Sequence, residues 1–173
     1  MSENEVLDTE LLDDQEEEDT QQDKFLTFFI NEEEYGIEIR CVTEIIRMQK
    51  ITQVPDVADF IKGVINLRGK VIPVMDVRLR FGLEECPYDN RTCIIVINVE
   101  EQAVGLIVDR VSEVLDIPAS EIDPPPRMYR GAKGRFILGL GKVEGGVKIL
   151  LNAQKFLSDE KVLLKEEIQQ KDE

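Results

Sequence analysis

The 173-residue chain contains no histidine and no tryptophan. Histidine is the commonest general base near neutral pH and the commonest metal ligand, so catalytic triads and histidine-based metal centres are excluded. Aromatic residues make up only 6% of the chain, which argues against a surface that stacks on nucleic-acid bases. A phosphate-binding P-loop is missing, and Gly139-Leu140-Gly141 has Glu144 where a dinucleotide loop needs its third glycine. We therefore expect no cofactor, no metal and no catalytic residue.

Cysteine is scarce, and long apolar runs are missing. The three cysteines are odd in number and lack Cys-x-x-Cys spacing, which predicts reduced thiols rather than disulfides or a zinc site. The longest purely apolar stretch, Cys93 to Ile97, is far too short to cross a bilayer. The acidic start lacks the basic region and apolar run of a secretory signal. These patterns predict a cytoplasmic protein without membrane insertion.

Negative charge is abundant but is concentrated near the ends of the chain. The formal net charge is −15, and residues 1–23 carry eleven acidic residues with no Lys or Arg. Residues 24–158 carry 19 acidic and 18 basic residues, so this part is nearly neutral. Nucleic acid and anionic lipid are bound by clustered basic residues, so we expect neither as a partner. Residues 1–23 are typical of a disordered acidic tail, and the alternative is an amphipathic helix around Val6, Leu7, Leu11 and Leu12.

Hydrophobic periodicity predicts an all-β core. The expected strands cover residues 25–30, 35–40, 60–65, 71–76, 93–99, 104–109 and two segments within 136–151. Residues 25–30 are apolar on both faces, which indicates a strand that is covered on both sides. Asn152 is placed to cap a closing helix, in which Phe156, Leu157, Leu163, Leu164 and Ile168 recur at helical spacing.

The two halves of the chain resemble each other. Residues 35–46 match 104–115 with a constant offset of 69, with Gly, Val, Glu and a hydroxyl residue in phase. Residues 60–76 match 136–152 with an offset of 76. We infer two copies of a small β-unit that pack on each other, because a unit of about 65 residues rarely buries enough apolar surface alone. The alternative is chance similarity between generic strand patterns.

This organisation predicts an ordered core between two tails. The expected segments are an acidic tail at 1–23, a globular domain at 24–158 with a first barrel at about 24–85 and a second at about 92–152, and a C-terminal helix and tail at 153–173.

The two copies differ at one turn. Residues 66–69 read Asn-Leu-Arg-Gly, and the corresponding residues 142–145 read Lys-Val-Glu-Gly. Glycine at the fourth position suits a turn with positive φ, but the turn does not require an arginine. Arg68 at a rigid hairpin tip could bind carboxylates or carbonyls of a partner with two parallel hydrogen bonds. The alternative is a solvated loop arginine.

An enzyme without histidine would depend on carboxylates. The candidates are Asp76, Asp109 and Asp116, of which Asp109 and Asp116 fit strand-end or turn positions better than catalytic ones. An enzyme is therefore the less favoured hypothesis, and a binding protein the favoured one.

Several motifs resemble the CheW family of bacterial chemotaxis adaptors. They are Tyr35 to Ile39, Phe60 to Gly69, Ile72 to Arg78 and Val104 to Val111, within a match that covers about residues 24–158. The resemblance implies two tandem five-stranded SH3-like barrels packed together, with a short C-terminal helix. It also implies a non-catalytic adaptor that couples the cytoplasmic tips of chemoreceptors to the histidine kinase CheA, and that partners recruit to membrane receptor arrays. The alternative is an adaptor or regulatory-domain fragment of a larger chemotaxis protein.

The resemblance also implies where the partners bind. The receptor would lie in a groove between the barrels, and the kinase regulatory domain would contact mainly the first barrel, at residues that the resemblance does not assign. The receptor-binding residues that it implies are Val42, Glu44, Gly63, Arg68, Gly105 and Val111.

Overall fold

A computed structural model describes residues 21–126 and 134–157. The predictions for the acidic residues 1–20, and for Leu163, Leu164 and Ile168, lie outside the described residues.

The described chain consists mostly of β-strands, as predicted. The strands are β1 (Lys24–Ile30), β2 (Glu33–Glu38), β3 (Val42–Arg47), β4 (Ile61–Leu67), β5 (Lys70–Asp76), β6 (Cys93–Val99), β7 (Gln102–Val108), β8 (Arg110–Asp116), β9 (Ile122–Asp123), β10 (Ile137–Val143) and β11 (Gly146–Leu151). The short helices are η1 (Ile39–Cys41), α2 (Val77–Arg80), η2 (Ala119–Glu121) and η3 (Gly134–Phe136), and residues 153–157 add a helical turn.

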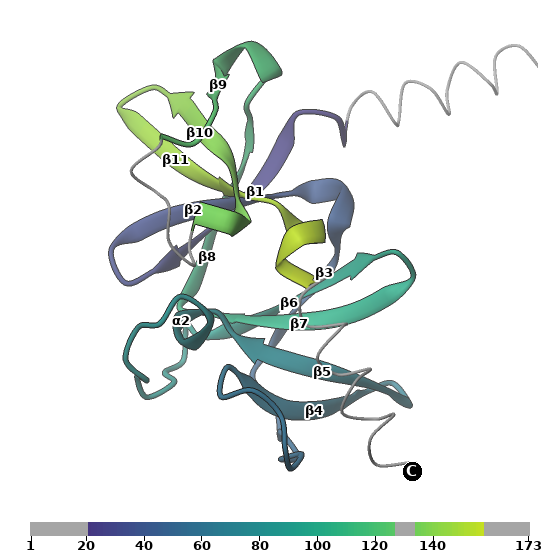
Figure 1. The fold of residues 1–173 in the computed structure, drawn as a ribbon. Helices are drawn as coiled ribbons and strands as arrows, with labels where there is room; N and C mark the ends of the chain where they lie inside the picture. Colours follow the sequence, from purple (N-terminus) through teal and green to yellow (C-terminus); the bar gives the residue numbers. More distant parts are fainter. Residues whose placement is uncertain (1–20, 127–133, 158–173) are drawn as a thin grey trace, which may run out of the picture.

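The strands form two sheets that lie one above the other in Figure 1. The six-stranded sheet has the order β8-β1-β2-β11-β10-β9, and the five-stranded sheet has the order β3-β6-β7-β5-β4. Within each sheet, one pair of strands is parallel: β2 with β11, and β5 with β7. The helical turn at 153–157 lies between the two sheets in Figure 1.

The strand pairing corrects the expected division into a barrel at about 24–85 and a barrel at about 92–152. β1 and β2 belong to the sheet that contains β8 to β11, whereas β6 and β7 belong to the sheet of β3 to β5. Each sheet thus combines the first two strands of one copy with the later strands of the other, which are β3 to β5 in the five-stranded sheet and β8 to β11 in the six-stranded sheet. Hydrophobic periodicity identifies which residues form strands, but any free strand edge of suitable register can supply the hydrogen bonds, so periodicity does not identify the partner.

The strand registers confirm the internal duplication. Thr27 lies opposite Gly36 in the β1–β2 hairpin, and Val96 lies opposite Gly105 in the β6–β7 hairpin, each shifted by the same 69 residues. The backbone N–H of Asp76 donates to Phe60 at 2.7 Å, and the N–H of Asn152 donates to Phe136 at the same distance. Chance similarity between strand patterns does not produce matching registers and matching long-range hydrogen bonds.

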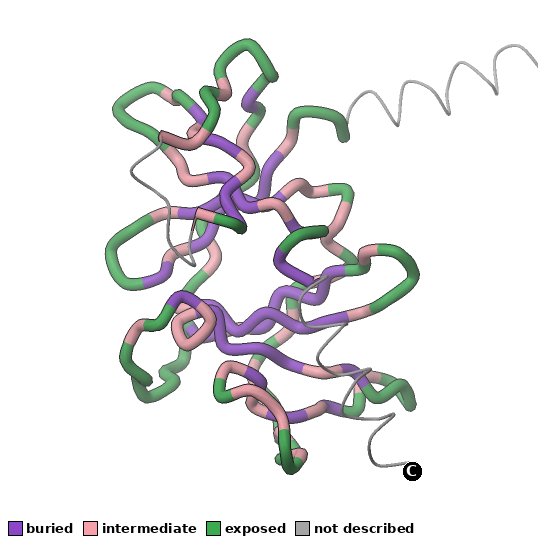
Figure 2. Tube along the Cα trace, in the orientation of Figure 1, coloured by how far each residue is buried: buried purple, intermediate pink, exposed green. Residues whose placement is uncertain are grey.

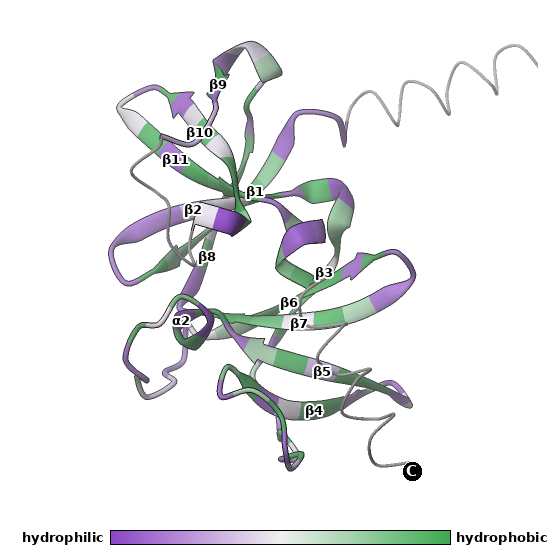
Figure 3. Ribbon diagram, viewed as in Figure 1, coloured by the Kyte–Doolittle hydropathy of each residue, from purple (hydrophilic) through white to green (hydrophobic). Residues whose placement is uncertain are grey.

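The largest hydrophobic core lies between the two sheets. Its buried members come from both, and they include Phe28 and Phe136 on one side and Met75 and Ile95 on the other. Smaller cores fill each unit, around Ile65, Ile72 and Ile94 in the five-stranded one and around Phe25, Ile117 and Leu150 in the other. Figures 2 and 3 show buried, apolar strand segments facing the middle of the molecule and polar hairpin tips. The shared core means that neither sheet buries its apolar face alone.

Equivalent caps end the last strand of each copy. The Asp76 carboxylate accepts hydrogen bonds from the backbone N–H groups of Arg78 and Leu79 at the start of α2. The Asn152 side chain accepts one from Lys155 at 3.0 Å, which confirms its predicted capping role. Within the described ranges, no helix is long and apolar enough to span a bilayer.

Candidate partner-binding site

Arg68 occupies the tip of the β4–β5 hairpin. Its φ is 51° and that of Gly69 is 87°, so both residues of the two-residue turn have positive φ, as in a type I′ turn. The side-chain carbonyl of Asn66 accepts the Gly69 N–H at 2.8 Å and stabilises the turn. An arginine is unfavourable in this backbone region.

The Arg68 side chain reaches Glu44 on β3. One guanidinium N–H of Arg68 donates to the Glu44 carboxylate. The Arg68 side chain is 71% exposed and that of Glu44 is 24% exposed. Because solvent screens exposed ion pairs, such a pair contributes little to stability. The guanidinium can therefore exchange Glu44 for a carboxylate of another protein at small cost.

The other sheet has no counterpart of this ion pair. The residues equivalent to Glu44 and Arg68 in the second copy are Glu113 and Glu144, which carry the same charge. Glu144 does not have the positive φ that Arg68 has, whereas Gly145 has a positive φ, as Gly69 does. The duplication thus places an arginine at the hairpin tip of the five-stranded sheet and a glutamate at the equivalent position of the six-stranded sheet.

Two of the expected receptor-binding residues are glycines with a clear structural reason. Gly63 has a φ of +144°, and a Cβ there would lie 2.1 Å from the carbonyl oxygen of Thr52. That carbonyl accepts the Val64 N–H at 2.9 Å, so a side chain at Gly63 would break the bridge between the two segments. A Cβ at Gly105 would lie 2.8 Å or less from side chains of Val74 and Ile94. Both glycines permit close packing, and receptor contact at either stays a prediction.

The two expected valines occupy equivalent positions in different sheets. Val42 lies on β3 and Val111 on β8, and their numbers differ by the offset of 69. Both are half-buried and pack against the core between the sheets. Of the six expected residues, the structure joins Glu44 and Arg68 directly and distributes the others over both sheets.

Exposed apolar side chains mark surfaces that the sequence interpretation missed. Val71 at the start of β5 is 65% exposed, and its equivalent Val147 on β11 is 54% exposed. Ile45 on β3 and its equivalent Val114 on β8 are exposed as well. The sequence could have revealed these surfaces because apolar residues recur at equivalent positions of the two copies, and the duplication preserves which strand face is exposed to solvent.

The three candidate carboxylates have separate structural roles. Besides capping α2, the buried Asp76 accepts a hydrogen bond from the Tyr88 hydroxyl at 2.8 Å. Burial, followed by this hydrogen bond, raises the pKa of Tyr88, so the hydroxyl stays a donor at neutral pH. Asp109 forms a bidentate pair with Arg78, and Asp116 lies at the surface 3.9 Å from Lys24. This arrangement supports folding and does not gather an acid and a base.

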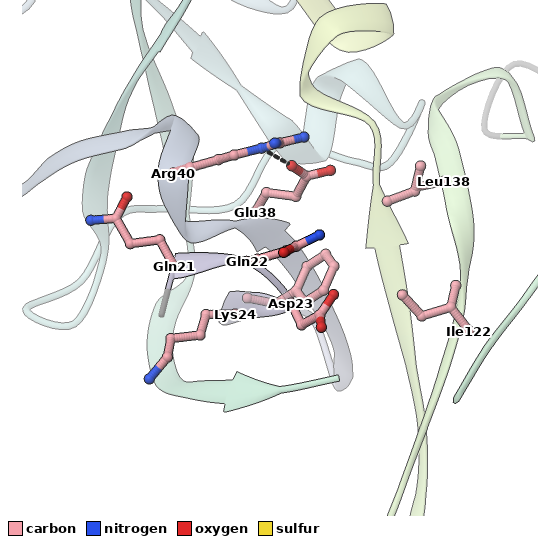
Figure 4. Close-up of a pocket in the computed structure, with 9 residues that line it drawn as sticks. Gln21, Gln22, Asp23, Lys24, Glu38, Arg40, Ile122 and Leu138 are labelled. Carbon is pink, nitrogen blue, oxygen red and sulfur yellow. Dashed lines mark hydrogen bonds and ion pairs between the residues drawn. The ribbon is translucent and has the colours of Figure 1, made fainter. Parts of the chain in front are cut away.

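A small hollow opens at one end of the six-stranded sheet (Figure 4). Its volume is about 180 Å³, whereas ligand pockets usually hold ~300 Å³ or more. Ile122 and Leu138 form one wall, and Arg40 and Glu38 are paired across from them. None of the six expected site residues lines it. Its size and mixed lining do not suggest a substrate site.

Comparison with known proteins identifies the family. The model of the CheW-like domain matches residues 24–161. This chain belongs to the CheW-like family. The chemotaxis protein CheW of Klebsiella aerogenes is 39% identical over 141 residues, which cover 82% of this chain and 85% of that protein. The chemotaxis protein CheW of Bacillus subtilis is 42% identical over 104 residues, 60% of this chain and 67% of that protein.

A solved structure of a CheW-like protein has the same fold. The crystal structure of the scaffolding protein TtCheW from Thermoanaerobacter tengcongensis matches with a TM-score of 0.71 and 37% identity, covering 75% of this chain and 88% of that chain. This agreement, together with the five- and six-stranded sheets, confirms the expected fold class of two packed SH3-like units.

Proposed function

We propose that this CheW-like protein is a non-catalytic adaptor that couples the cytoplasmic tips of chemoreceptors to the histidine kinase CheA. The observation that carries the proposal is the family match over residues 24–161, with relatives that are named chemotaxis proteins and one that is named a scaffolding protein. The candidate carboxylates are committed to caps and ion pairs, which supports binding rather than catalysis. The protein works in the cytoplasm, and its partners recruit it to membrane receptor arrays.

In the proposed mechanism, the protein binds two partners at different surfaces. A helical hairpin of the receptor lies in a groove between the two sheets, with Arg68, Glu44 and the valines Val42 and Val111 at or near the contact. The kinase regulatory domain docks elsewhere, mainly on the expected first barrel at about 24–85, most of whose strands, β3 to β5, lie in the five-stranded sheet. Because the two partners bind different surfaces, a signal passes as a change in their relative geometry.

Co-sedimentation tests the coupling directly. The purified protein would be mixed with a receptor signalling-tip peptide fused to a sedimentable coiled coil, with the kinase regulatory domain, and with both. We expect binding to each partner and a ternary complex in which the adaptor raises the amount of kinase domain sedimented with the receptor. A folded adaptor that binds neither partner would refute the proposed function.

Arg68→Glu tests the receptor surface. The substitution reverses the charge at position 68 and places a second acidic side chain next to Glu44. We therefore expect receptor binding to weaken about tenfold or more. Arg91→Glu changes the same charge at another exposed arginine and is the matched control. Equal receptor binding by a well-folded Arg68→Glu protein would exclude Arg68 from the contact.

A further inference from the structure

We propose that α2 fixes the angle between the two sheets through Arg78 and Arg80, and that this angle controls binding of a ligand that touches both sheets. The proposal rests on the proposed function only for the identity of that ligand, the receptor tip. The two arginines are positioning residues, because they act through the arrangement of the sheets.

Arg80 holds aromatic rings from both sheets. Its guanidinium carbon lies 4.3 Å from the ring centre of Phe60, 4.4 Å from that of Phe136 and 5.8 Å from that of Phe156. Phe60 directly precedes β4 of the five-stranded sheet, whereas Phe136 directly precedes β10 of the six-stranded sheet. The Nε and Nη2 atoms of Arg80 are buried. Buried cation–π contacts are stronger than exposed ones because water does not compete for the cation.

The duplication shows that these residues lie where the two copies meet. Phe60 and Phe136 are equivalent by the offset of 76, and so are Arg80 and Phe156. The cluster therefore contains both members of each equivalent pair, and the Arg80 guanidinium is the one that lies near all three phenylalanine rings, whereas Arg135 lies over Phe136 at 5.2 Å. A planar guanidinium between rings restricts their orientation more than another apolar side chain would.

Arg78 makes a second connection from α2. Its Nε and Nη2 donate to the two carboxylate oxygens of Asp109 at 2.8 and 2.5 Å. Asp109 also accepts the Asn31 N–H at 2.7 Å, and its own N–H donates to Phe29 at 3.1 Å. Asn31 and Phe29 belong to the β1–β2 hairpin of the six-stranded sheet. Asp109 directly follows β7, which pairs with β5 in the five-stranded sheet. Arg78 therefore connects α2 to the six-stranded sheet through Asp109 and its hydrogen bonds to Asn31 and Phe29.

These contacts restrict the relative orientation of the two sheets, which the apolar interface alone does not fix. The apolar core between the sheets favours their association, but the hydrophobic effect itself is non-directional. Bidentate pairs and ring-stacked arginines have narrow geometries. A ligand that spans both sheets needs one fixed angle, whereas a ligand on one sheet does not. Loss of either arginine should therefore weaken receptor binding selectively.

The test compares Arg80→Met and Arg78→Met with the control Arg91→Met, which removes an exposed arginine from the segment between β5 and β6. Binding to the receptor-tip peptide and to the kinase regulatory domain would be titrated separately on the full-length protein. We expect receptor affinity to fall about tenfold for each of the first two variants, with kinase affinity within about twofold of wild type. Arg91→Met should match wild type for both partners. Arg80→Lys keeps the charge without the planar group and should be intermediate.

The angle itself can be measured without partners. The three native cysteines would be replaced, and spin labels would be attached at Val71→Cys and Val147→Cys. Double electron–electron resonance then reports the distance between the two sheets. We expect a broader or shifted distance distribution in Arg80→Met and Arg78→Met. An unchanged distribution, or equal loss of both partners by folded variants, would overturn the inference. If wild type binds neither partner while the distributions still change, the proposed function fails and the positioning role stands.

Discussion

The two parallel strand pairs, the β2–β11 seam and the β5–β7 seam, are equivalent by the duplication but contain different side-chain pairs. At the parallel β2–β11 seam, Lys148 forms an ion pair with Glu34, and their side chains are only 22% and 10% exposed. The equivalent residues at the β5–β7 seam are Ile72 and Ala103, which pack in the core of the five-stranded unit. The same backbone geometry thus accepts either a mostly buried ion pair or an apolar contact.

We expect Glu34→Ala alone to lower the free energy of unfolding by about 1–3 kcal/mol, because Lys148 would keep its charge in a mostly buried place. The double variant Glu34→Ala with Lys148→Ile copies the other seam and should lie within about 1 kcal/mol of wild type. Urea denaturation of the three proteins measures both effects. Additive destabilisation in the double variant would show that the seams are not interchangeable.

The three free cysteines should differ in reactivity. Cys86 is exposed, whereas Cys41 and Cys93 are half-buried, and burial is the main cause that raises the pKa of each of their thiols. Because buried thiols are less accessible and the thiolate is the reactive form, we expect one fast thiol and two slow ones that accelerate only under more alkaline conditions. Titration with a chromogenic disulfide measures the rates. The Cys86→Ser variant should lose the fast phase, and retention of that phase would contradict the assignment.

At the scale of elements, the β4–β5 hairpin shows a conflict between folding and binding. Arg68 sits at the first position of a turn that prefers Asn or Gly there. We expect Arg68→Asn to raise the free energy of unfolding by about 0.5–1 kcal/mol, since it relieves the unfavourable φ and loses only an exposed ion pair. The same variant should lose receptor affinity. Thermal denaturation and receptor titration measure the two effects, and a less stable Arg68→Asn protein would show that the ion pair outweighs the strain.

The sequence predicted some elements better than others. The hairpins at β4–β5 and β6–β7 were predicted because alternating or continuous apolar residues flank short polar turns. β3 and β8 were not predicted as strands, since half or more of their residues are exposed and their apolar residues are few. They become strands because β6 and β1 offer them edges for hydrogen bonding. Such strands depend on tertiary partners rather than on their own periodicity.

At the scale of the whole molecule, the exchange of strands makes the two halves depend on each other. In the first half, β2 and β5 pair with β11 and β7 of the second. We therefore expect fragments 1–85 and 86–173 to lack cooperative unfolding when separate and to form a folded 1:1 complex when mixed. Circular dichroism melts and sedimentation velocity measure both states.

A control sharpens this expectation. Cutting the full-length protein with a protease site inserted in the exposed residues 84–91, which follow α2, should leave the halves associated, because β2 and β5 still pair with β11 and β7 across the cut. A fragment that unfolds cooperatively as a monomer would contradict the interdependence of the halves.

The sequence by itself determined that this is an all-β, duplicated, histidine-free protein, and it singled out Arg68 as a turn residue whose counterpart in the other copy, Glu144, has the opposite charge. These properties follow from local periodicity, from residue chemistry and from similarity along the chain. The tertiary structure alone decided which copy's strands share a sheet, that Glu44 lies against Arg68, and that Arg78 and Arg80 connect the sheets. Strand edges and exposed side chains have many possible partners in sequence, and only the packing of the complete chain selects among them.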